Sequence, residues 1–446
     1  MKPNYLPLVV LALAGCRQAT TPAIAQNDAP APIQEVKRDT PLDKYLARPE
    51  AAYRWTKGAD GEFAGGDANL RLVSQTWQGK PWTHRLEIHK PDTVRHGDAA
   101  ILNISFGSGS LPESFIGKQL ANATGAYVVN VFNAPNQPLY DRYEDDLIAY
   151  TLGKYLETGD ETWPLLFPMT KSVTKSMDAL QDWSEQNGGK ISRFIVSGAS
   201  KRGWTTDLVA ATDTRVVGAI PIVYNNLNLA AQIAHQKEVW TTTSSMMAPY
   251  AEVGLFDQTT TESGKKLMEM IDPWSYRARL TMPKLLINAT NDAYWPHDAS
   301  TLYLKDLPGQ TDMFLVPNAP HILGADITAA IGSAAAWSRL VLDGKPAPKL
   351  TLKSEEGEKG HTFVLSTDGA PRVARLWLAS SRSKDFRNAK WRSVELKPRD
   401  GGYKATVAED ALYPAGTKYA AAYAEIEVAA QPLPLRLSSE VWEGEK

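Results

Sequence analysis

The distribution of apolar residues divides the chain into two regions with different periodicities. Between residues 41 and 345, short apolar runs alternate with longer stretches of helical character. The early runs alternate as antiparallel strands do, whereas the later ones are continuous, as in a parallel sheet covered on both faces. Eight such runs occur, at residues 70–77, 83–89, 99–106, 127–132, 193–196, 216–223, 284–289 and 313–316.

This order predicts an α/β fold of the α/β-hydrolase type, a mostly parallel eight-stranded sheet with helices on both faces. Residues 225–276 are more than a crossover needs and contain helical patterns at 227–237 and 264–270, so we expect a helical cap there.

Past residue 345 the helical patterns stop, and Pro346-Ala347-Pro348 marks a boundary. Short strand patterns follow at residues 362–366, 373–379, 391–396, 419–428 and 435–441. This spacing is typical of a β-sandwich, so we expect a β-sandwich-like domain over residues 350–446.

The first 16 residues have the features of a bacterial lipoprotein signal peptide. Lys2 precedes an apolar run at 6–14, and Leu13-Ala14-Gly15-Cys16 matches the sequence in which the cysteine is acylated. We therefore expect lipidation at Cys16 and attachment to the bacterial outer membrane, facing the periplasm or the exterior. Cleavage after Ala23-Ile24-Ala25 is the alternative, and it would release a soluble periplasmic or secreted protein.

Residues 17–40 are rich in Ala, Pro, Thr and Gln and predict a flexible tether. The 48 Lys and Arg residues nearly balance the 50 Asp and Glu residues, so no bulk charge favours nucleic acid or a membrane surface. Cys16 is the only cysteine, which excludes intrachain disulfides. We expect a small-molecule or peptide substrate, no nucleic acid, and membrane contact only through the lipid; the oligomeric state stays open.

A Gly-x-Ser sequence joins the fifth predicted strand to a helix predicted from residue 204. The run from Phe194 reads Phe-Ile-Val-Ser-Gly-Ala-Ser-Lys-Arg-Gly, with Ser200 between Gly198 and Gly203. Small neighbours permit the tight turn of a nucleophile elbow, which exposes the serine hydroxyl. The usual elbow has a glycine two residues after the serine, where this chain has Arg202. We predict Ser200 as the nucleophile.

An acid and a histidine follow the last two strands of the first region, in the order that this fold requires. Asp292 comes directly after the seventh strand and His321 after the eighth. We predict a triad of Ser200, His321 and Asp292, with Asp298 as the alternative acid. Asp298 would also suit a helix cap, which needs no catalytic role. For His321 the non-catalytic interpretation is a histidine in a surface loop.

Backbone N–H groups are expected to form an oxyanion hole. The candidates are the N–H of Lys201 and that of Gly107 or Ser108, in the Gly-Ser-Gly-Ser sequence after the third strand. Lys201 and Arg202 begin a helix, where the macrodipole disfavours cations. We expect at least one to pair with an acid, from Asp207, Asp213 or the cluster Glu144-Asp145-Asp146, and the other to face the cleft.

Substrate-binding candidates are therefore Arg202, Glu144 and Asp145. Three consecutive acids also suit a solvated helix start, which is the structural alternative for the acidic cluster.

At these residues the chain resembles the PhoPQ-activated pathogenicity-related protein family of the α/β-hydrolase superfamily. The matching segments are 198–206 (Gly-Ala-Ser-Lys-Arg-Gly-Trp-Thr-Thr), 213–216, 272–273, 282–284, 307–309 and 316–319, with 144–145 and 149–151. The resemblance implies a secreted or envelope protein with a serine-hydrolase core. Relatives tend to show an acidic and an aromatic residue after the acid, where this chain has Ala293-Tyr294.

The sequence thus predicts a serine hydrolase, an esterase or peptidase of the cell envelope that cleaves an ester or amide bond through an acyl-enzyme. The predicted chemistry uses no cofactor and no metal. The alternative is a non-catalytic or weakly catalytic binding protein that keeps the hydrolase scaffold, since fold does not fix function.

Overall fold

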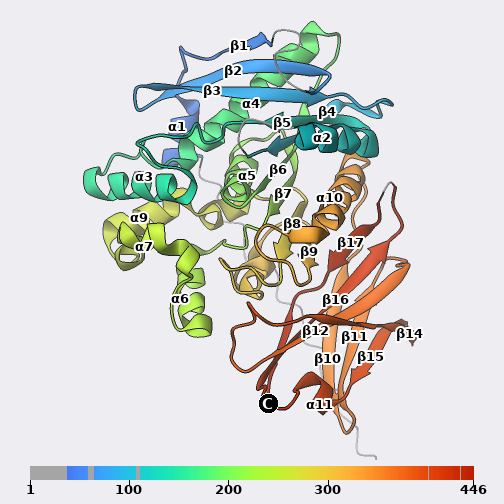
Figure 1. The fold of residues 1–446 in the computed structure, drawn as a ribbon. Coiled ribbons are helices and arrows are strands. Elements are labelled where there is room, and N and C mark those ends of the chain that lie inside the picture. The colour runs from blue at the N-terminus through green and yellow to red at the C-terminus, as the bar shows by residue number, and fades with distance from the viewer. Residues whose placement is uncertain (1–37, 59–64, 107–110, 400, 432) are drawn as a thin grey trace, which may run out of the picture. The chain divides into compact units, whose positions relative to one another are not determined.

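The computed structural model describes residues 38–58, 65–106, 111–399, 401–431 and 433–446. Within these residues, the chain up to 345 folds around one mixed sheet with the strand order β1-β2-β3-β5-β4-β6-β7-β8-β9 (Figure 1). The strands are β1 (Arg54–Lys57), β2 (Ala68–Trp77), β3 (Lys80–His89), β4 (His96–Ile104), β5 (Ala126–Val131), β6 (Arg193–Ala199), β7 (Val216–Ile222), β8 (Lys284–Ala289) and β9 (Thr311–Val316).

Strands β1, β2 and β3 pair antiparallel, β5 runs antiparallel to β3, and β4 to β9 are parallel. Strands β6 to β9 are almost wholly buried, which explains their continuous apolar sequence. The predicted α/β-hydrolase fold is confirmed, with each predicted strand in its place. Strand β1 was not predicted, because its four mostly exposed residues carry no alternating pattern.

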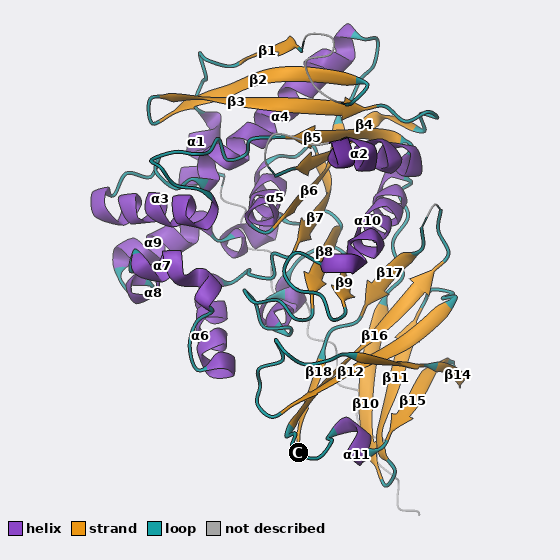
Figure 2. Ribbon diagram, in the orientation of Figure 1, coloured by secondary structure: helices purple, strands orange, loops and turns teal. Residues whose placement is uncertain are grey.

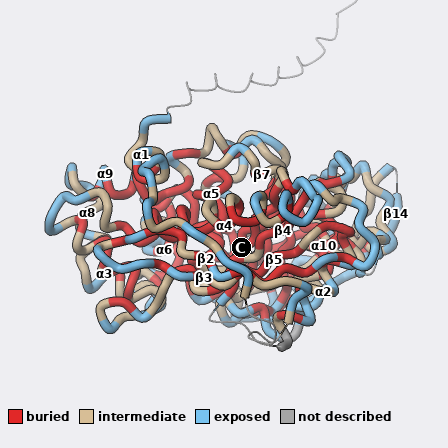
Figure 3. Tube along the Cα trace, turned by 90° about the horizontal axis from the view of Figure 1, so that it is seen from above, coloured by how far each residue is buried: buried red, intermediate tan, exposed pale blue. Residues whose placement is uncertain are grey.

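Helices cover both faces of this sheet and enclose two cores (Figures 2 and 3). Helices α4 (Leu166–Gln186) and α5 (Lys201–Thr212) pack on one face, in a core that contains Leu180 and Leu208. Helices α2 (Leu111–Thr124) and α10 (Ile327–Leu342) pack on the other, in a core that contains Ala121 and Trp337.

The segment between β7 and β8, where a cap was expected, is helical. It contains α6 (Leu229–Trp240), η1 (Ser245–Met247), α7 (Ala248–Glu252), α8 (Leu255–Gln258), α9 (Glu262–Ile271) and η2 (Pro273–Arg279). The remaining helical elements are α1 (Pro41–Ala47), α3 (Glu144–Thr158), η3 (Ala299–Leu302), η4 (Leu304–Asp306), η5 (Gly324–Asp326) and α11 (Glu409–Leu412). Helix α3 packs against α7 and α9. No helix in the described ranges is long and apolar enough to cross a bilayer.

The C-terminal residues form two antiparallel sheets. The first contains β12 (Val373–Ser381), β13 (Arg392–Glu395), β16 (Tyr419–Val428), β17 (Leu435–Ser438) and β18 (Trp442–Glu445). The second contains β10 (Leu350–Gly357), β11 (Gly360–Thr367), β14 (Lys397–Arg399) and β15 (Gly402–Val407). Side chains from both sheets, such as Phe363 and Leu376, share one core.

The first C-terminal sheet continues the hydrolase sheet. Ser438 of β17 pairs with Met313 of β9, and the Ser438 hydroxyl accepts a hydrogen bond from the Leu315 N–H at 3.0 Å. Sequence analysis anticipated a boundary here but not this pairing, because one short register contact leaves no pattern in either strand.

Candidate active site

Ser200 lies in a strained turn between β6 and α5. Its backbone has φ 57° and ψ −123°, a conformation that is unfavourable for a residue with a side chain. Strain of this kind persists only where the surrounding structure imposes it. The tight turn directs the hydroxyl toward the loops that follow β8 and β9.

Two glycines make this turn possible by allowing backbones to approach each other. A Cβ atom at Gly198 would lie 2.6 Å from the Arg202 carbonyl oxygen, and one at Gly203 would lie 2.8 Å from the Tyr224 Cβ. Both distances are far below van der Waals contact. The chain therefore needs glycine at 198 and 203, and it tolerates Arg202 at the place where the usual elbow has glycine.

The structure brings Ser200, His321 and Asp292 together. The His321 Nε2 lies 2.9 Å from the Ser200 Oγ, and the His321 Nδ1 lies 2.8 Å from the Asp292 Oδ2. A carboxylate can only accept, so Nδ1 carries the proton and Nε2 accepts from the serine hydroxyl. Asp292 is buried with 3% of its side chain exposed, and His321 keeps 17% exposed.

Tyr294, which sequence analysis did not single out as a site residue, supports this arrangement from two sides. Its ring packs on the His321 imidazole with centroids 4.3 Å apart, and its backbone N–H donates to the Asp292 Oδ1 at 2.8 Å. Both oxygens of Asp292 are thus engaged. The signal in the sequence was the aromatic residue two places after the acid, which the resembling family also tends to show; the departure from its pattern is at Ala293.

Asp298, the alternative acid, lies beside a different histidine. The His235 Nε2 is 2.9 Å from the Asp298 Oδ1 and 2.8 Å from the Oδ2. The geometry therefore joins Asp292, and not Asp298, to His321.

Both loops that carry these residues are bonded to the C-terminal region. The Asn318 side chain exchanges two hydrogen bonds with the Trp391 backbone, at 2.9 and 2.8 Å. The Asn291 Nδ2 donates to the Ala389 carbonyl at 2.7 Å. Asn291 precedes Asp292 and Asn318 lies three residues before His321, so the segment between β12 and β13 helps to fix the positions of the acid and the histidine.

Arg202 and Lys201 both pair with the acidic start of α3. The Arg202 guanidinium makes a bidentate pair with Glu144 at 2.6 and 2.8 Å, donates to the Ala134 carbonyl at 3.1 Å, and lies over the Phe106 ring. The Lys201 Nζ lies 2.8 Å from Glu144 and 3.5 Å from Asp145. Only 1% of the Arg202 side chain is exposed, so this residue fixes the backbone and does not line a cavity.

The expected pairing with Glu144 thus occurs, but both cations take part in it, and Arg202 does not face the cleft. Two other acids named as possible partners lie elsewhere. Asp207 is buried, and burial raises its pKa to about 8, while Asp213 pairs with Arg215 at 2.7 Å.

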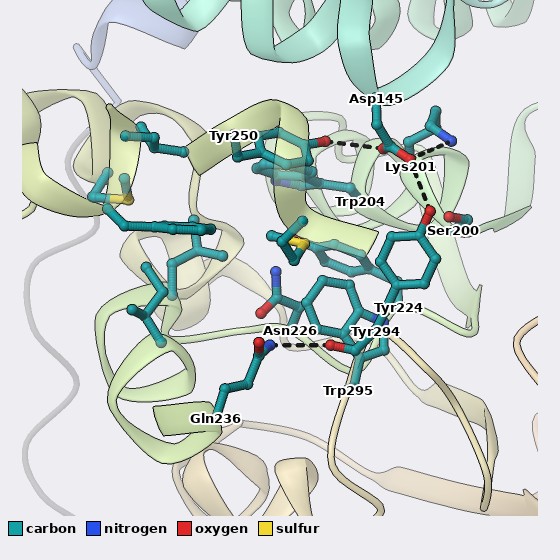
Figure 4. Close-up of a pocket in the computed structure, with 16 residues that line it drawn as sticks. Asp145, Ser200, Lys201, Trp204, Tyr224, Asn226, Gln236, Tyr250, Tyr294 and Trp295 are labelled. Carbon is teal, nitrogen blue, oxygen red and sulfur yellow. Dashed lines mark hydrogen bonds and ion pairs between the residues drawn. The ribbon is translucent and has the colours of Figure 1, made fainter. Parts of the chain in front are cut away.

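An apolar cavity of about 630 Å³, including its open mouth, lies beside Ser200 (Figure 4). Aromatic side chains dominate its wall: Trp204, Tyr224, Tyr250, Tyr294 and Trp295. Asp145 and Lys201 are its charged members. Asp145 accepts hydrogen bonds from the Tyr250 and Tyr294 hydroxyls at 3.0 and 2.9 Å, so its charge is satisfied by two phenols and an ammonium.

A second cavity of about 1370 Å³, including its mouth, meets Ser200 and His321 from the side of α2 and α10. Its wall is also mainly apolar, with Phe106 and Ile322 exposed at the surface. Ser200 therefore lies between two apolar spaces. Gly107 and Ser108, nominated for the oxyanion hole, and Cys16, nominated for lipidation, lie outside the described residues.

The order of the strands, with Ser200 after β6, Asp292 after β8 and His321 after β9, defines an α/β-hydrolase fold. The comparisons give the family. The chain belongs to the PhoPQ-activated pathogenicity-related protein family, which it matches over residues 42–387. It is 31% identical over 378 residues to autocrine proliferation repressor protein A from Dictyostelium discoideum, covering 78% of this chain and 76% of that protein.

Solved structures that resemble the chain include esterases and peptidases. Acetyl xylan esterase 1 from Thermoanaerobacterium sp. has 15% identity and a TM-score of 0.45, covering 68% of this chain and 92% of that one. A puromycin-hydrolyzing peptidase from Mycobacterium tuberculosis has 17% identity and a TM-score of 0.41, covering 67% and 41%.

Replacing Glu144 by glutamine is expected to lower the free energy of unfolding by up to about 3 kcal/mol near neutral pH. That is the low end of the range for breaking a buried pair, because 35% of the Glu144 side chain is exposed. Burial would raise the Glu144 pKa, but Arg202 and Lys201 together lower it to about 2 from 4.5. The stabilisation is therefore complete above about pH 4.5 and is lost as the pH falls toward about 2.

Chemical denaturation of both proteins across this range tests the prediction, since the difference between them should narrow with falling pH. Asp146→Asn is the matched control, because its surface pair with Arg142 contributes at most about 1 kcal/mol. Equal stability of the Glu144→Gln variant and the wild type at neutral pH would refute the structural role of this pair.

Proposed function

We propose that this protein is a serine hydrolase that cleaves an ester or amide bond through an acyl-enzyme. The observation that supports it most directly is the hydrogen-bonded chain from Ser200 through His321 to Asp292, on a strained turn of the hydrolase sheet. A protein that only binds a ligand has no need for all three groups in this geometry.

In the proposed reaction, the Ser200 oxygen attacks the substrate carbonyl carbon while the His321 Nε2 takes the hydroxyl proton. The tetrahedral intermediate collapses, and the leaving alcohol or amine takes that proton from His321. Water then attacks the acyl-enzyme and transfers a proton to Nε2. The carboxylic acid leaves as Ser200 is protonated again. Asp292 holds the tautomer in which Nε2 can accept and stabilises the imidazolium.

The negative oxygen of the intermediate needs donors that are already in position. Lys201 is the first residue of α5, and N–H groups in the first turn of a helix have no acceptor within that helix. We propose the Lys201 N–H as one donor. The helix dipole adds to its effect, since the amino-terminal end of a helix favours negative charge.

The cavities indicate the kind of group that the substrate carries. Aromatic and aliphatic side chains form most of the walls of both cavities. The charged members already have polar neighbours: Lys201 pairs with Asp145 and with Glu144, and Glu113 accepts from the Ser105 hydroxyl at 2.7 Å. A charged substrate group would have to lose its hydration there without gaining a free counter-charge. We propose uncharged substrates with bulky apolar groups.

A binding role is the second candidate. The Dictyostelium relative is named for repression of proliferation and not for a reaction, so the scaffold is compatible with a signalling partner. Covalent reactivity at Ser200 separates the two functions.

A fluorophosphonate probe is expected to label the wild-type protein at Ser200 and not to label the Ser200→Ala variant. The alanine removes only the attacking oxygen, so the variant should keep the circular dichroism spectrum of the wild type. Mass spectrometry of the labelled peptide locates the adduct. A wild-type protein that stays unlabelled would favour the binding role, and full labelling of the variant would assign another nucleophile.

The Asp292→Asn variant is expected to lose about 10⁴-fold in kcat/KM on an activated ester, because an amide stabilises the wrong tautomer of His321. Asp298→Asn is the matched comparison, because Asp298 is a buried carboxylate in the same loop and also contacts a histidine, His235 of α6. This variant should lose far less in kcat/KM. Steady-state kinetics on both variants decides the assignment. A larger loss in Asp298→Asn would exclude Asp292 as the acid.

Among esters with the same leaving group, we expect kcat/KM to be highest for an uncharged aromatic or branched acyl group. Acyl groups of the same size that carry a carboxylate or an ammonium should react at least about tenfold more slowly, because each must be desolvated without a free partner. A panel of p-nitrophenyl esters measures this. A preference for the anionic ester that disappears in Lys201→Gln would show instead that Lys201 binds substrate.

A further inference from the structure

A cluster of metal-ligating side chains lies apart from Ser200, where the loop after β8 meets the last strand. His297 and Asp298 belong to the loop, and Glu443 belongs to β18. One ligand atom from each of the three lies within 4.8 Å of the others. The residues come from segments about 145 positions apart, so no sequence motif connects them, and sequence analysis expected no metal.

His297 and Asp298 are the buried members of this cluster, and His297 is the more enclosed by aromatic rings. Its side chain is 3% exposed, and its ring packs against Phe386 at 4.5 Å and Trp391 at 5.9 Å between centroids. The His297 Nε2 lies 2.8 Å from the Glu443 Oε1, yet it makes no well-oriented hydrogen bond within the described residues. A buried imidazole nitrogen without such a bond is unfavourable unless it binds something else.

Asp298 is held in place by a residue of the predicted cap. The His235 side chain, from α6, contacts both carboxylate oxygens of Asp298 at 2.8 to 2.9 Å. Carboxylates that bind metals are typically held by hydrogen bonds from outer groups, as Asp298 is held by His235.

The charged residues near Glu443 pair with one another, which leaves the Glu443 carboxylate available to bind an ion. Glu238 pairs with Lys384 at 2.6 Å and Asp385 pairs with Arg387 at 2.7 Å. In the described part of the chain, His297 is the one ion-pair partner of Glu443 within 4 Å. The Glu443 side chain is 45% exposed, so an ion can reach the cluster from solvent.

We propose that His297, Asp298 and Glu443 bind a divalent transition-metal ion, with His235 orienting Asp298. An imidazole nitrogen with two carboxylates favours Zn²⁺ over Mg²⁺ or Ca²⁺, which prefer all-oxygen sites. The ion would join the loop that follows Asp292 to the last strand of the chain. The proposal does not depend on the proposed hydrolase activity.

Titration of the full chain, stripped with a chelator, by Zn²⁺ in a calorimeter tests the site. We expect one equivalent to bind, with a rise in the melting temperature that saturates at the same stoichiometry. His297→Gln and Glu443→Gln should each weaken binding at least tenfold, and His235→Gln about 10- to 100-fold. Mg²⁺ and Ca²⁺ at the same concentration should not compete.

His361→Gln is the matched control, because His361 also lies near a glutamate, Glu409 at 3.6 Å, in the same C-terminal region. It should bind Zn²⁺ as the wild type does. Glu443 is partly exposed, so the Glu443→Gln variant should fold. It therefore tests the site even if the buried His297→Gln variant does not fold. Binding that is absent in the wild type, unchanged in Glu443→Gln, or weakened equally in His361→Gln would overturn the proposal.

Discussion

The buried guanidinium of Arg202 is the contact on which the geometry around Ser200 depends. It joins the first turn of α5 to the start of α3 through Glu144, to the Ala134 carbonyl, and to the Phe106 ring. These groups come from four separate parts of the chain, and Arg202 joins them two residues after Ser200. A cation at the amino-terminal end of a helix opposes the macrodipole, and the two carboxylates at the start of α3 offset that cost. Arg202 stands where the usual elbow has its second glycine. Unlike a glycine, it fixes the turn through an ion pair with Glu144.

Much of the fold was predictable because local patterns and global topology agree. Continuous apolar runs gave β6 to β9, since a parallel sheet buries both faces, and the turn-rich sequences after them placed Ser200, Asp292 and His321 at one edge. The same logic failed where an element lacks its own pattern. The mostly exposed β1 has no alternation, and the pairing of β17 with β9 depends on a single register contact.

The site was predictable to the extent that function follows chain order. The order of serine, acid and histidine after β6, β8 and β9 specifies the three residues, but it says nothing of side chains that reach them from elsewhere. Tyr294 packs on His321 because the loop after β8 turns back over it, which the loop's composition does not reveal. Arg202 was expected either to pair or to face the cleft. The burial of its side chain shows that it pairs. That burial depends on segments distant in the sequence, so it could not be predicted from the residues around Arg202.

The C-terminal strands act on the site without contributing a residue to it. Asn291 and Asn318 each donate to backbone carbonyls between β12 and β13, and each lies within three residues of Asp292 or His321. An acid–histidine pair works only when the distance between its members is held to a fraction of an ångström, and loops alone seldom provide that precision. The acceptors are backbone carbonyls of a segment whose two ends are the paired strands β12 and β13, and asparagine can reach them with short side chains that lose little entropy. The segment between β12 and β13 is therefore best understood as the outer support of the acid and the histidine.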